Sequence, residues 1–362
     1  MSKILCIIMS FILFGQPLFA LRVGIVSSAH YCGEREVGWR IKKAAEKLGW
    51  NVLLDETKGR RIDQIGGLDF AIHLIPYIKP IRQCTHNFLT VFHPFNYITD
   101  QGSLVSSYKR FNGFLLAIEP AEMFLNSLHR LYWIPFYPTV DARPFDKLPL
   151  RNLATMLPVW GNRLTDPKFK NFYSILCAGA FTKFYGLTDG DGMVATHYMG
   201  PIPFDGESVL DVLQENGIVL ILHSDIHNQN GIPTSRIFEA AAASAVIISD
   251  CNPFVQNNFG DSVYYIDTDL SAEEIYAQVE NHMKSIWANP EQAWSRAEKA
   301  HQIFSDRFQM TDQLLKLEAM HKQLKINRMK KRKGLYDSET VADDALPLAL
   351  PVWHQLCSFY GA

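Results

Sequence analysis

Short apolar runs alternate with amphipathic stretches along the chain from Arg22 onward. The apolar runs are typical of buried strands and the amphipathic stretches of helices, so the pattern predicts repeated βαβ units with largely parallel sheets. A helix is predicted at residues 36–48, where apolar residues recur at helical spacing and Gly49 follows as a stop signal. Strands are predicted in this first half at residues 23–27, 51–54, 69–75, 88–92 and 113–118.

The same alternation begins again near residue 150. From residue 271 to about 325 the pattern is helical, with an interruption near Asn289 and Pro290. The chain has 362 residues, which is enough for two domains of ordinary size. We therefore predict two Rossmann-like α/β domains, at residues 21–150 and 151–325. The second half has predicted strands at residues 153–159, 181–185, 217–222, 245–249 and 262–266, and predicted helices at 168–176, 208–215 and 234–243.

Composition narrows the class of protein but does not name a partner. A hydrophobic fraction of 48% and a charged fraction of 20% are those of a globular protein. The formal net charge of -2 gives no overall attraction to nucleic acid, so no nucleic-acid partner is expected. Six cysteines are present without a Cys-x-x-Cys pair, which disfavours zinc-ribbon and thioredoxin-like sites.

The two ends of the chain differ from the rest. Lys3, the apolar run 4–14 and Ala20 follow one another in the order of a secretory signal peptide, which we predict at residues 1–20. An extra N-terminal strand or helix is the alternative. Residues 326–362 are predicted as a basic and then apolar tail. The cluster Arg328–Lys333 is typical of a solvated segment, with peripheral contact to an anionic membrane as the alternative.

A polar segment follows the buried strand predicted at residues 217–222. His223 ends this strand, residues 225–231 form a predicted polar loop, and Thr234 or Ser235 is a natural N-cap of the next helix. A helix N-terminus has free N–H groups and a partial positive charge, which suit phosphate groups. Open α/β sheets bind ligands at the carboxyl ends of their strands. The segment is therefore the predicted site for a nucleotide diphosphate.

Three side chains of this helix have predicted roles in binding. Ser235 is expected at the phosphates, with Arg236 as the cation that offsets their charge. Glu239 lies four residues after Ser235, on the same face of the helix, and its carboxylate can accept hydrogen bonds from ribose hydroxyls. The alternative is a capped surface helix with an ion pair between Arg236 and Glu239.

At residues 233–240 (Pro-Thr-Ser-Arg-Ile-Phe-Glu-Ala) and 245–250 (Ala-Val-Ile-Ile-Ser-Asp), the sequence resembles the group 1 glycosyl transferases of the GT-B fold. The resemblance continues to about residue 325. It implies two facing domains with a cleft, a nucleotide-sugar donor bound mainly to the second domain, and a ribose contact at Glu239. It also implies retention of the anomeric configuration. We expect no metal ion and no other cofactor. Many relatives carry a further glutamate eight residues before the ribose-binding one, where this chain has Gly231.

Loops after other predicted strands supply the remaining candidates. His30 follows the first strand and His93 follows the strand at 88–92, and both are candidate catalytic residues of the acceptor side. Arg163 follows the strand at 153–159 and is, with His223, a candidate contact of the donor diphosphate. A Rossmann NAD site is disfavoured, because neither domain has Gly-x-Gly-x-x-Gly after its first strand.

The expected activity is thus transfer of a sugar from a nucleotide sugar to a glycan, lipid or protein acceptor. An exported two-lobed binding protein without catalysis and a sugar-nucleotide epimerase of the same fold are the alternatives. The signal-like N-terminus indicates export or membrane association, whereas nucleotide sugars are normally found in the cytoplasm, so the location stays open.

Overall fold

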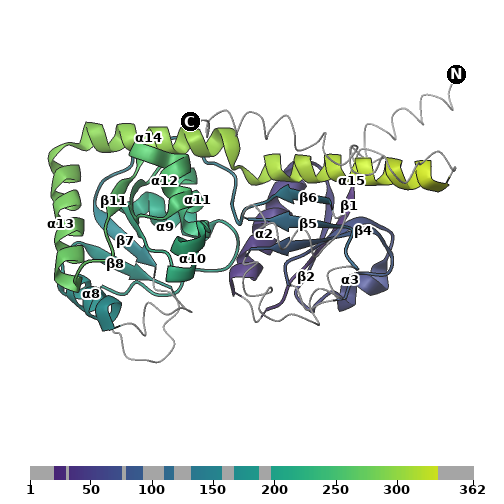
Figure 1. The fold of residues 1–362 in the computed structure, drawn as a ribbon, viewed down its shortest axis with the longest axis horizontal. Helices are drawn as coiled ribbons and strands as arrows, with labels where there is room; N and C mark the ends of the chain where they lie inside the picture. The colour runs from purple at the N-terminus through teal and green to yellow at the C-terminus, as the bar shows by residue number, and fades with distance from the viewer. Residues whose placement is uncertain are drawn as a thin grey trace, which may run out of the picture.

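The computed structural model describes residues 20–29, 32–75, 79–92, 110–117, 132–156, 167–186 and 197–332. The predicted signal peptide, Ala20 excepted, lies outside the described residues, as does the tail beyond residue 332. Two separate parallel sheets lie side by side in Figure 1, each with helices against it, as the sequence pattern predicts. In the described part of the chain, no helix is both long and apolar enough to cross a bilayer.

The first sheet has six parallel strands in the order β2-β1-β3-β4-β5-β6. All five strands predicted for this half are present, whereas β6 and the short helix α3 are not evident in the sequence pattern. Helix α3 has six residues, too few for a helical periodicity to be seen, and β6 has four. The elements are β1 (Arg22–Val26), α2 (Cys32–Lys47), β2 (Asn51–Asp55), α3 (Arg60–Ile65), β3 (Leu68–His73), β4 (Cys84–Val91), β5 (Gly113–Leu116) and β6 (Tyr132–Pro135).

The second sheet has five parallel strands in the order β11-β10-β9-β7-β8. Its central strand β9 is fully buried, in keeping with a sheet covered by helices on both faces. The elements are β7 (Asn152–Met156), α8 (Pro167–Ala178), β8 (Thr182–Tyr185), α9 (Ser208–Asn216), β9 (Gly217–Ile221), α10 (Asp225–Asn230), α11 (Ser235–Ala242), β10 (Val246–Asp250), α12 (Pro253–Phe259), β11 (Tyr264–Ile266), α13 (Ala272–Ala288) and α14 (Pro290–Arg307).

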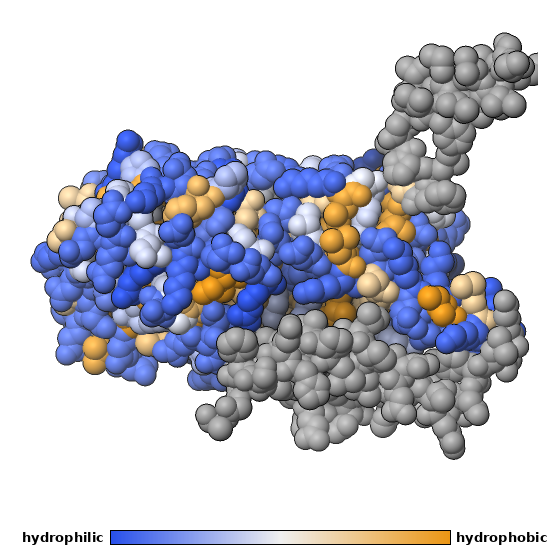
Figure 2. Space-filling model, turned by 90° about the horizontal axis from the view of Figure 1, so that it is seen from above, coloured by the Kyte–Doolittle hydropathy of each residue, from blue (hydrophilic) through white to orange (hydrophobic). Residues whose placement is uncertain are grey.

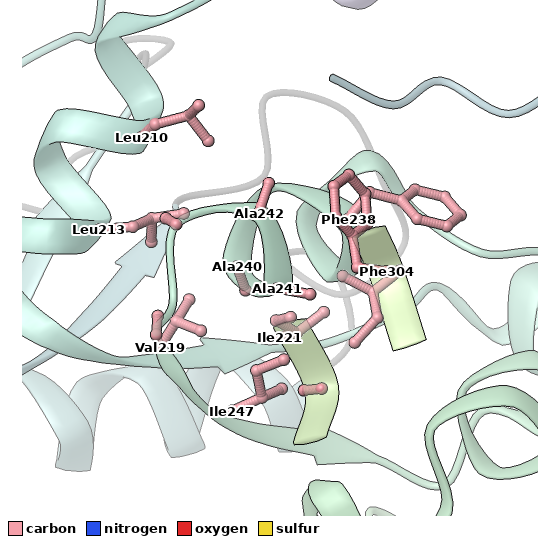
Figure 3. Packing of buried hydrophobic residues seen from close by; sticks show 14 of the residues in the cluster. Leu210, Leu213, Val219, Ile221, Phe238, Ala240, Ala241, Ala242, Ile247 and Phe304 are labelled. Atoms are coloured by element: carbon pink, nitrogen blue, oxygen red, sulfur yellow. The ribbon is translucent and has the colours of Figure 1, made fainter. Parts of the chain in front are cut away.

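Helix α11 lies close against the second sheet. Its three alanines, residues 240–242, and the C-cap residue Ala243 are fully buried, and their small side chains let the helix backbone approach the strands. Figure 3 shows Ala240 and Ala241 above Val219 and Ile247 of the two central strands, with Phe238 of the same helix beside Phe304 of α14. This packing fixes the position of the N-terminus of α11 relative to the ends of β9 and β10.

The last helix, α15 (Met310–Arg332), returns to the first domain and lies along its upper side in Figure 1. Its apolar face, with Leu314, Leu317 and Leu324, belongs to the same buried cluster as Phe70 and Phe88 of the first sheet. Sequence alone assigns residues 310–325 to the second domain. In space these residues complete the core of the first.

A buried histidine pair joins α15 to β4. Nδ1 of His321 lies 2.9 Å from Nδ1 of His86, and both residues are at most 3% exposed. Burial, with the nearby charge of Lys325, lowers the pKa of His321 to about 4. Burial, with the neighbouring His321, also lowers the pKa of His86 to about 4. The pair is therefore neutral at neutral pH.

The segment before α11 differs from its prediction. Residues 225–231, expected as a polar loop, form the short helix α10, which begins after Ser224 and has Asp225 in its first turn. Gly231 ends it in the left-handed conformation, with φ 59°. A glycine adopts this backbone without steric cost, whereas a glutamate would be strained there.

Candidate functional site

The N-terminus of α11 lies at the carboxyl ends of the neighbouring strands β9 and β10. Thr234 is the N-cap residue, and its side chain makes no capping hydrogen bond to the helix. Thr234, Ser235 and Arg236 are all partly exposed. The first N–H groups of a helix have no partner within the helix and carry a partial positive charge. This end of α11 therefore suits a phosphate group, as the sequence predicts.

Glu239, in the next turn of α11, is fully buried and binds two arginines. Its Oε2 accepts a hydrogen bond from Nη1 of Arg236 at 2.7 Å, and its Oε1 accepts one from Nη2 of Arg40 at 2.5 Å. Burial alone would raise the pKa of Glu239, but the charges of Arg236 and Arg40 lower it to about 2. The carboxylate is therefore ionised at any physiological pH.

Arg40 connects the two domains. It belongs to α2 of the first domain, and its side chain is only 1% exposed. Besides Glu239, it binds Glu36 on its own helix, with 2.9 Å between Nη2 and Oε1. Glu36 in turn accepts the backbone N–H of Gly206, just before α9, at 3.1 Å. We call Glu36, Arg40, Arg236 and Glu239 the junction network, since it holds α2 against α11 across the domain boundary.

A cavity of about 230 Å³ lies beside the junction network, between α2, the segment 140–143 and the start of α9. Its cationic side chains are already paired: Lys43 with Glu207 at 2.8 Å, and Lys47 with Asp141 at 3.1 Å. Pockets that enclose a drug-sized ligand usually measure about 300–1,000 Å³. The cavity is therefore too small for a complete nucleotide sugar while the junction network is closed.

His223 lies below the N-terminus of α11. Its Nδ1 is 2.6 Å from Oδ1 of Asp250, its backbone N–H donates to Oδ2 of the same carboxylate at 2.8 Å, and both side chains are fully buried. Nε2 of His223 is 3.5 Å from the hydroxyl of Thr234. Asn228 of α10 also donates to Asp250, at 3.0 Å. The sequence predicts a direct contact between His223 and the diphosphate. In the structure His223 is fully buried and lies beneath Thr234, the N-cap residue of α11.

Three predicted site residues, His30, His93 and Arg163, lie outside the described residues. Each follows a described strand, β1, β4 and β7 respectively, by a few residues. Their roles stay predictions. Of the other four, the structure brings Ser235, Arg236 and Glu239 together on α11, with His223 beneath them.

Sequence reasoning missed Glu36 and Arg40. A signal for Arg40 is present, because it lies three residues after Val37 and four before Ala44, both on the buried face of α2. A charged residue on the apolar face of a helix requires a buried partner of opposite charge. The partner, Glu239, is 199 residues away and cannot be identified from the pattern.

Two Asp-x-Asp tripeptides occur in the chain. Asp189 and Asp191 lie outside the described residues. Asp267 and Asp269 follow β11, where the side chain of Asp267 accepts the backbone N–H of Asp269 at 2.8 Å. Across the described ranges, no group of three or more histidine, cysteine, aspartate or glutamate side chains is placed to hold a metal ion.

No protein-family model matches the chain, and no curated protein sequence matches it. Several solved structures do, at about the same low identity. An alpha-glucosyltransferase in complex with UDP and a 13-mer DNA has a TM-score of 0.55 at 10% identity, over 82% of this chain and 99% of that one. A glycosyltransferase from Rickettsia africae has a TM-score of 0.54 at 10% identity, over 85% and 99%.

A third similar structure is sucrose-phosphate synthase from Thermosynechococcus elongatus, with a TM-score of 0.51 at 10% identity, over 84% of this chain and 99% of that one. At such identities the likeness concerns the fold, and it extends over nearly the whole length of each similar protein. Two parallel-sheet domains, joined by a last helix that returns to the first, agree with it. The chain has the GT-B fold.

Proposed function

We propose that the chain is a glycosyltransferase that takes its sugar from a nucleotide-sugar donor bound at the N-terminus of α11. The observation that carries the proposal is the uncapped start of this helix at the junction of two GT-B domains, with Ser235 and Arg236 partly exposed around it. The similar alpha-glucosyltransferase is in complex with UDP, which supports a nucleotide ligand for this fold.

Donor binding in this proposal requires the junction network to open. Glu239 is fully buried between Arg40 and Arg236, so ribose hydroxyls reach its carboxylate only after one of these side chains moves, and we take Arg40 as the one that does. The movement is favoured by one feature of the closed state. Nη1 of Arg40 is buried without a hydrogen-bond partner among the described residues, and an unsatisfied buried donor costs about 1–3 kcal/mol. Exchange of the Arg40 contact for ribose hydroxyls would relieve this cost.

Three finer parts of the proposal come from the sequence. Retention of configuration rests on the resemblance at residues 233–240 and 245–250, and His30 and His93 are candidates because they follow predicted strands. The first domain binds the acceptor, with His30 and His93 as candidate catalytic residues. The transfer keeps the anomeric configuration, which NMR of the first-formed product would test. It proceeds without a metal ion, so an excess of EDTA should leave the rate of transfer unchanged.

The test is binding and hydrolysis of a panel of UDP-, GDP-, ADP- and dTDP-sugars, measured by isothermal titration calorimetry and by release of nucleotide. Glu239→Gln should abolish binding, because an amide is a poorer acceptor for two hydroxyls and unbalances the junction network. Ser235→Ala should weaken binding at least about tenfold, because a hydrogen bond to a charged group contributes about 1.5–3 kcal/mol.

Glu298→Gln, on the exposed side of α14, is the matched control and should bind as the wild type does. Ser235 makes no hydrogen bond that its replacement would break within the described structure, so Ser235→Ala keeps the test valid even if Glu239→Gln fails to fold. The proposal is wrong if no nucleotide of the panel binds the wild-type chain.

A further inference from the structure

The C-terminal part of α15 carries a concentrated positive charge. After Glu318 the helix has no acidic residue up to Arg332. Lys322 binds Glu318, and Nζ of Lys325 lies 3.9 Å from Asp69 at the start of β3. The other cations form no ion pair within the described part of the chain. The cations of this segment are Lys322, Lys325, Arg328, Lys330, Lys331 and Arg332.

Two apolar side chains lie exposed among these cations. Ile326 is 42% exposed and Met329 is 54% exposed. At 100° per residue, both lie on the side of the helix opposite Leu324, which packs into the core of the first domain. Figure 2 looks onto the face that carries α14 and α15 and shows separate hydrophobic areas between hydrophilic ones. On the same count, Lys322 and Lys330 share this side, whereas Arg328 and Lys331 lie on the side of Leu324 but past Asn327, the last buried residue.

Within the described ranges, no residue buries this end of the helix. Asn327 is the last buried residue of α15, and residues 328–332 are all exposed. In Figure 1 the end of α15 projects beyond the strands of the first domain. The face is also remote from the junction network, which lies at the other end of this domain against α11.

An interfacial helix that binds a membrane has this combination of groups: apolar side chains that enter the boundary of the acyl chains, and cations that meet anionic headgroups. Single exposed apolar residues are common on protein surfaces, so the inference rests on their place among six cations rather than on their exposure alone. A nucleic acid would use the cations, but single-stranded binding is typically built on aromatic side chains and neither apolar residue is aromatic. The whole chain has a net charge of -2, so the positive charge is local to this surface.

We infer that the outward face of α15 at residues 322–332 docks on an anionic lipid surface. This contact would hold the first domain against the membrane while the junction with the second domain stays in the aqueous phase. The inference does not depend on the proposed function, because it rests on charge and exposure at a separate surface.

Co-sedimentation of the full chain with lipid vesicles tests the inference. The wild type should sediment with vesicles of mixed phosphatidylcholine and phosphatidylglycerol far more than with phosphatidylcholine alone, and added salt should reduce the difference. Since each cation near an anionic surface strengthens binding about fivefold, removal of four should weaken it by at least about 100-fold. The variant carries Arg328→Gln, Lys330→Gln, Lys331→Gln and Arg332→Gln.

A matched control loses four positive charges from exposed lysines of the second domain and of the segment just before it. This control should bind as the wild type does. The control carries Lys147→Gln, Lys170→Gln, Lys284→Gln and Lys299→Gln. Equal loss of binding in both quadruple variants, or equal binding of the wild type to neutral and anionic vesicles, would overturn the inference.

The double variant Ile326→Ser with Met329→Ser separates a membrane from other polyanions. Both residues are exposed, so the fold should be kept. Weaker binding to anionic vesicles with an unchanged thermal unfolding midpoint supports the membrane contact. If instead the wild type binds a DNA duplex and fails to bind anionic vesicles, the surface serves nucleic acid and the inference is wrong.

Discussion

Replacement of Arg40 by methionine would remove a charge that the two domains share and keep a side chain of similar length. The side chains concerned are inaccessible to water: Arg40 is 1% exposed and Glu239 is 0% exposed. After the replacement, Glu239 keeps only Arg236, and Glu36 keeps only the N–H of Gly206. Two carboxylates would therefore lose a buried counter-charge at once.

The expected cost can be worked out in two ways. Removal of one partner of a buried ion pair typically costs about 3–5 kcal/mol. The pKa of Glu239 gives a second measure: burial would raise it, yet the charges of Arg236 and Arg40 bring it from 4.5 to about 2. One pKa unit corresponds to about 1.4 kcal/mol, so the net shift favours the ionised form by about 3 kcal/mol, and the arginines contribute more than this because they also offset burial. Because Arg236 remains in the variant, we expect a loss of about 2–3 kcal/mol.

Urea unfolding followed by far-ultraviolet circular dichroism at neutral pH measures this loss. The matched control is Lys42→Met on the same helix, which breaks a surface ion pair with Glu46. Surface pairs contribute less than about 1 kcal/mol, so the control should unfold close to the wild type. If Arg40→Met lowers the free energy of unfolding no more than Lys42→Met does, the junction network does not hold the domains as argued.

Three further predictions follow from the structure. Arg40→Met should bind the nucleotide part of the donor more tightly than the wild type in calorimetry, because Glu239 is then free for ribose; weaker binding would show that Arg40 belongs to the donor site. The histidine pair is neutral when folded, with each pKa lowered from 6.5 to about 4 by burial, so its contribution to stability is complete above pH 6.5 and is lost as the pH falls towards 4. His321→Phe should flatten the pH dependence of the thermal midpoint in that range, and an unchanged slope would contradict the assignment. Gly231→Ala should destabilise the chain by about 1–2 kcal/mol because φ is 59°, whereas Gly33→Ala, in α2 with open space around it, should not; equal midpoints for both would refute the argument.

Much of the fold could be predicted from the sequence because the strands are buried on both faces. Runs such as residues 217–222 contain only apolar residues and glycine, which is typical of strands buried on both faces of a parallel sheet. Short elements escape this reasoning. Helix α10 has only six residues, all of them polar except Ile226, so its composition is that of a loop. It ends at Gly231, whose backbone N–H donates to the carbonyl oxygens of His227 and Asn228.

The site could be predicted only as far as it is local in sequence. Ser235, Arg236 and Glu239 lie within two turns of one helix, so their proximity follows from helical geometry. The partners that decide what these residues can do come from elsewhere. Arg40 lies on a helix of the other domain, and Asp250 approaches His223 only because β10 pairs with β9. Long-range pairing of this kind leaves no periodic signal in a single sequence.

The return of α15 to the first domain has a consequence for synthesis of the chain. The ribosome completes the first sheet early, but the residues that cover Phe70 and Phe88 are among the last described ones to be made. Until Leu314, Leu317 and Leu324 emerge, one face of that sheet exposes apolar surface of the kind that aggregates or recruits chaperones. The first half of the protein can therefore reach its final core only after nearly the whole second half has been translated. A fragment that ends near residue 150 should be insoluble for the same reason.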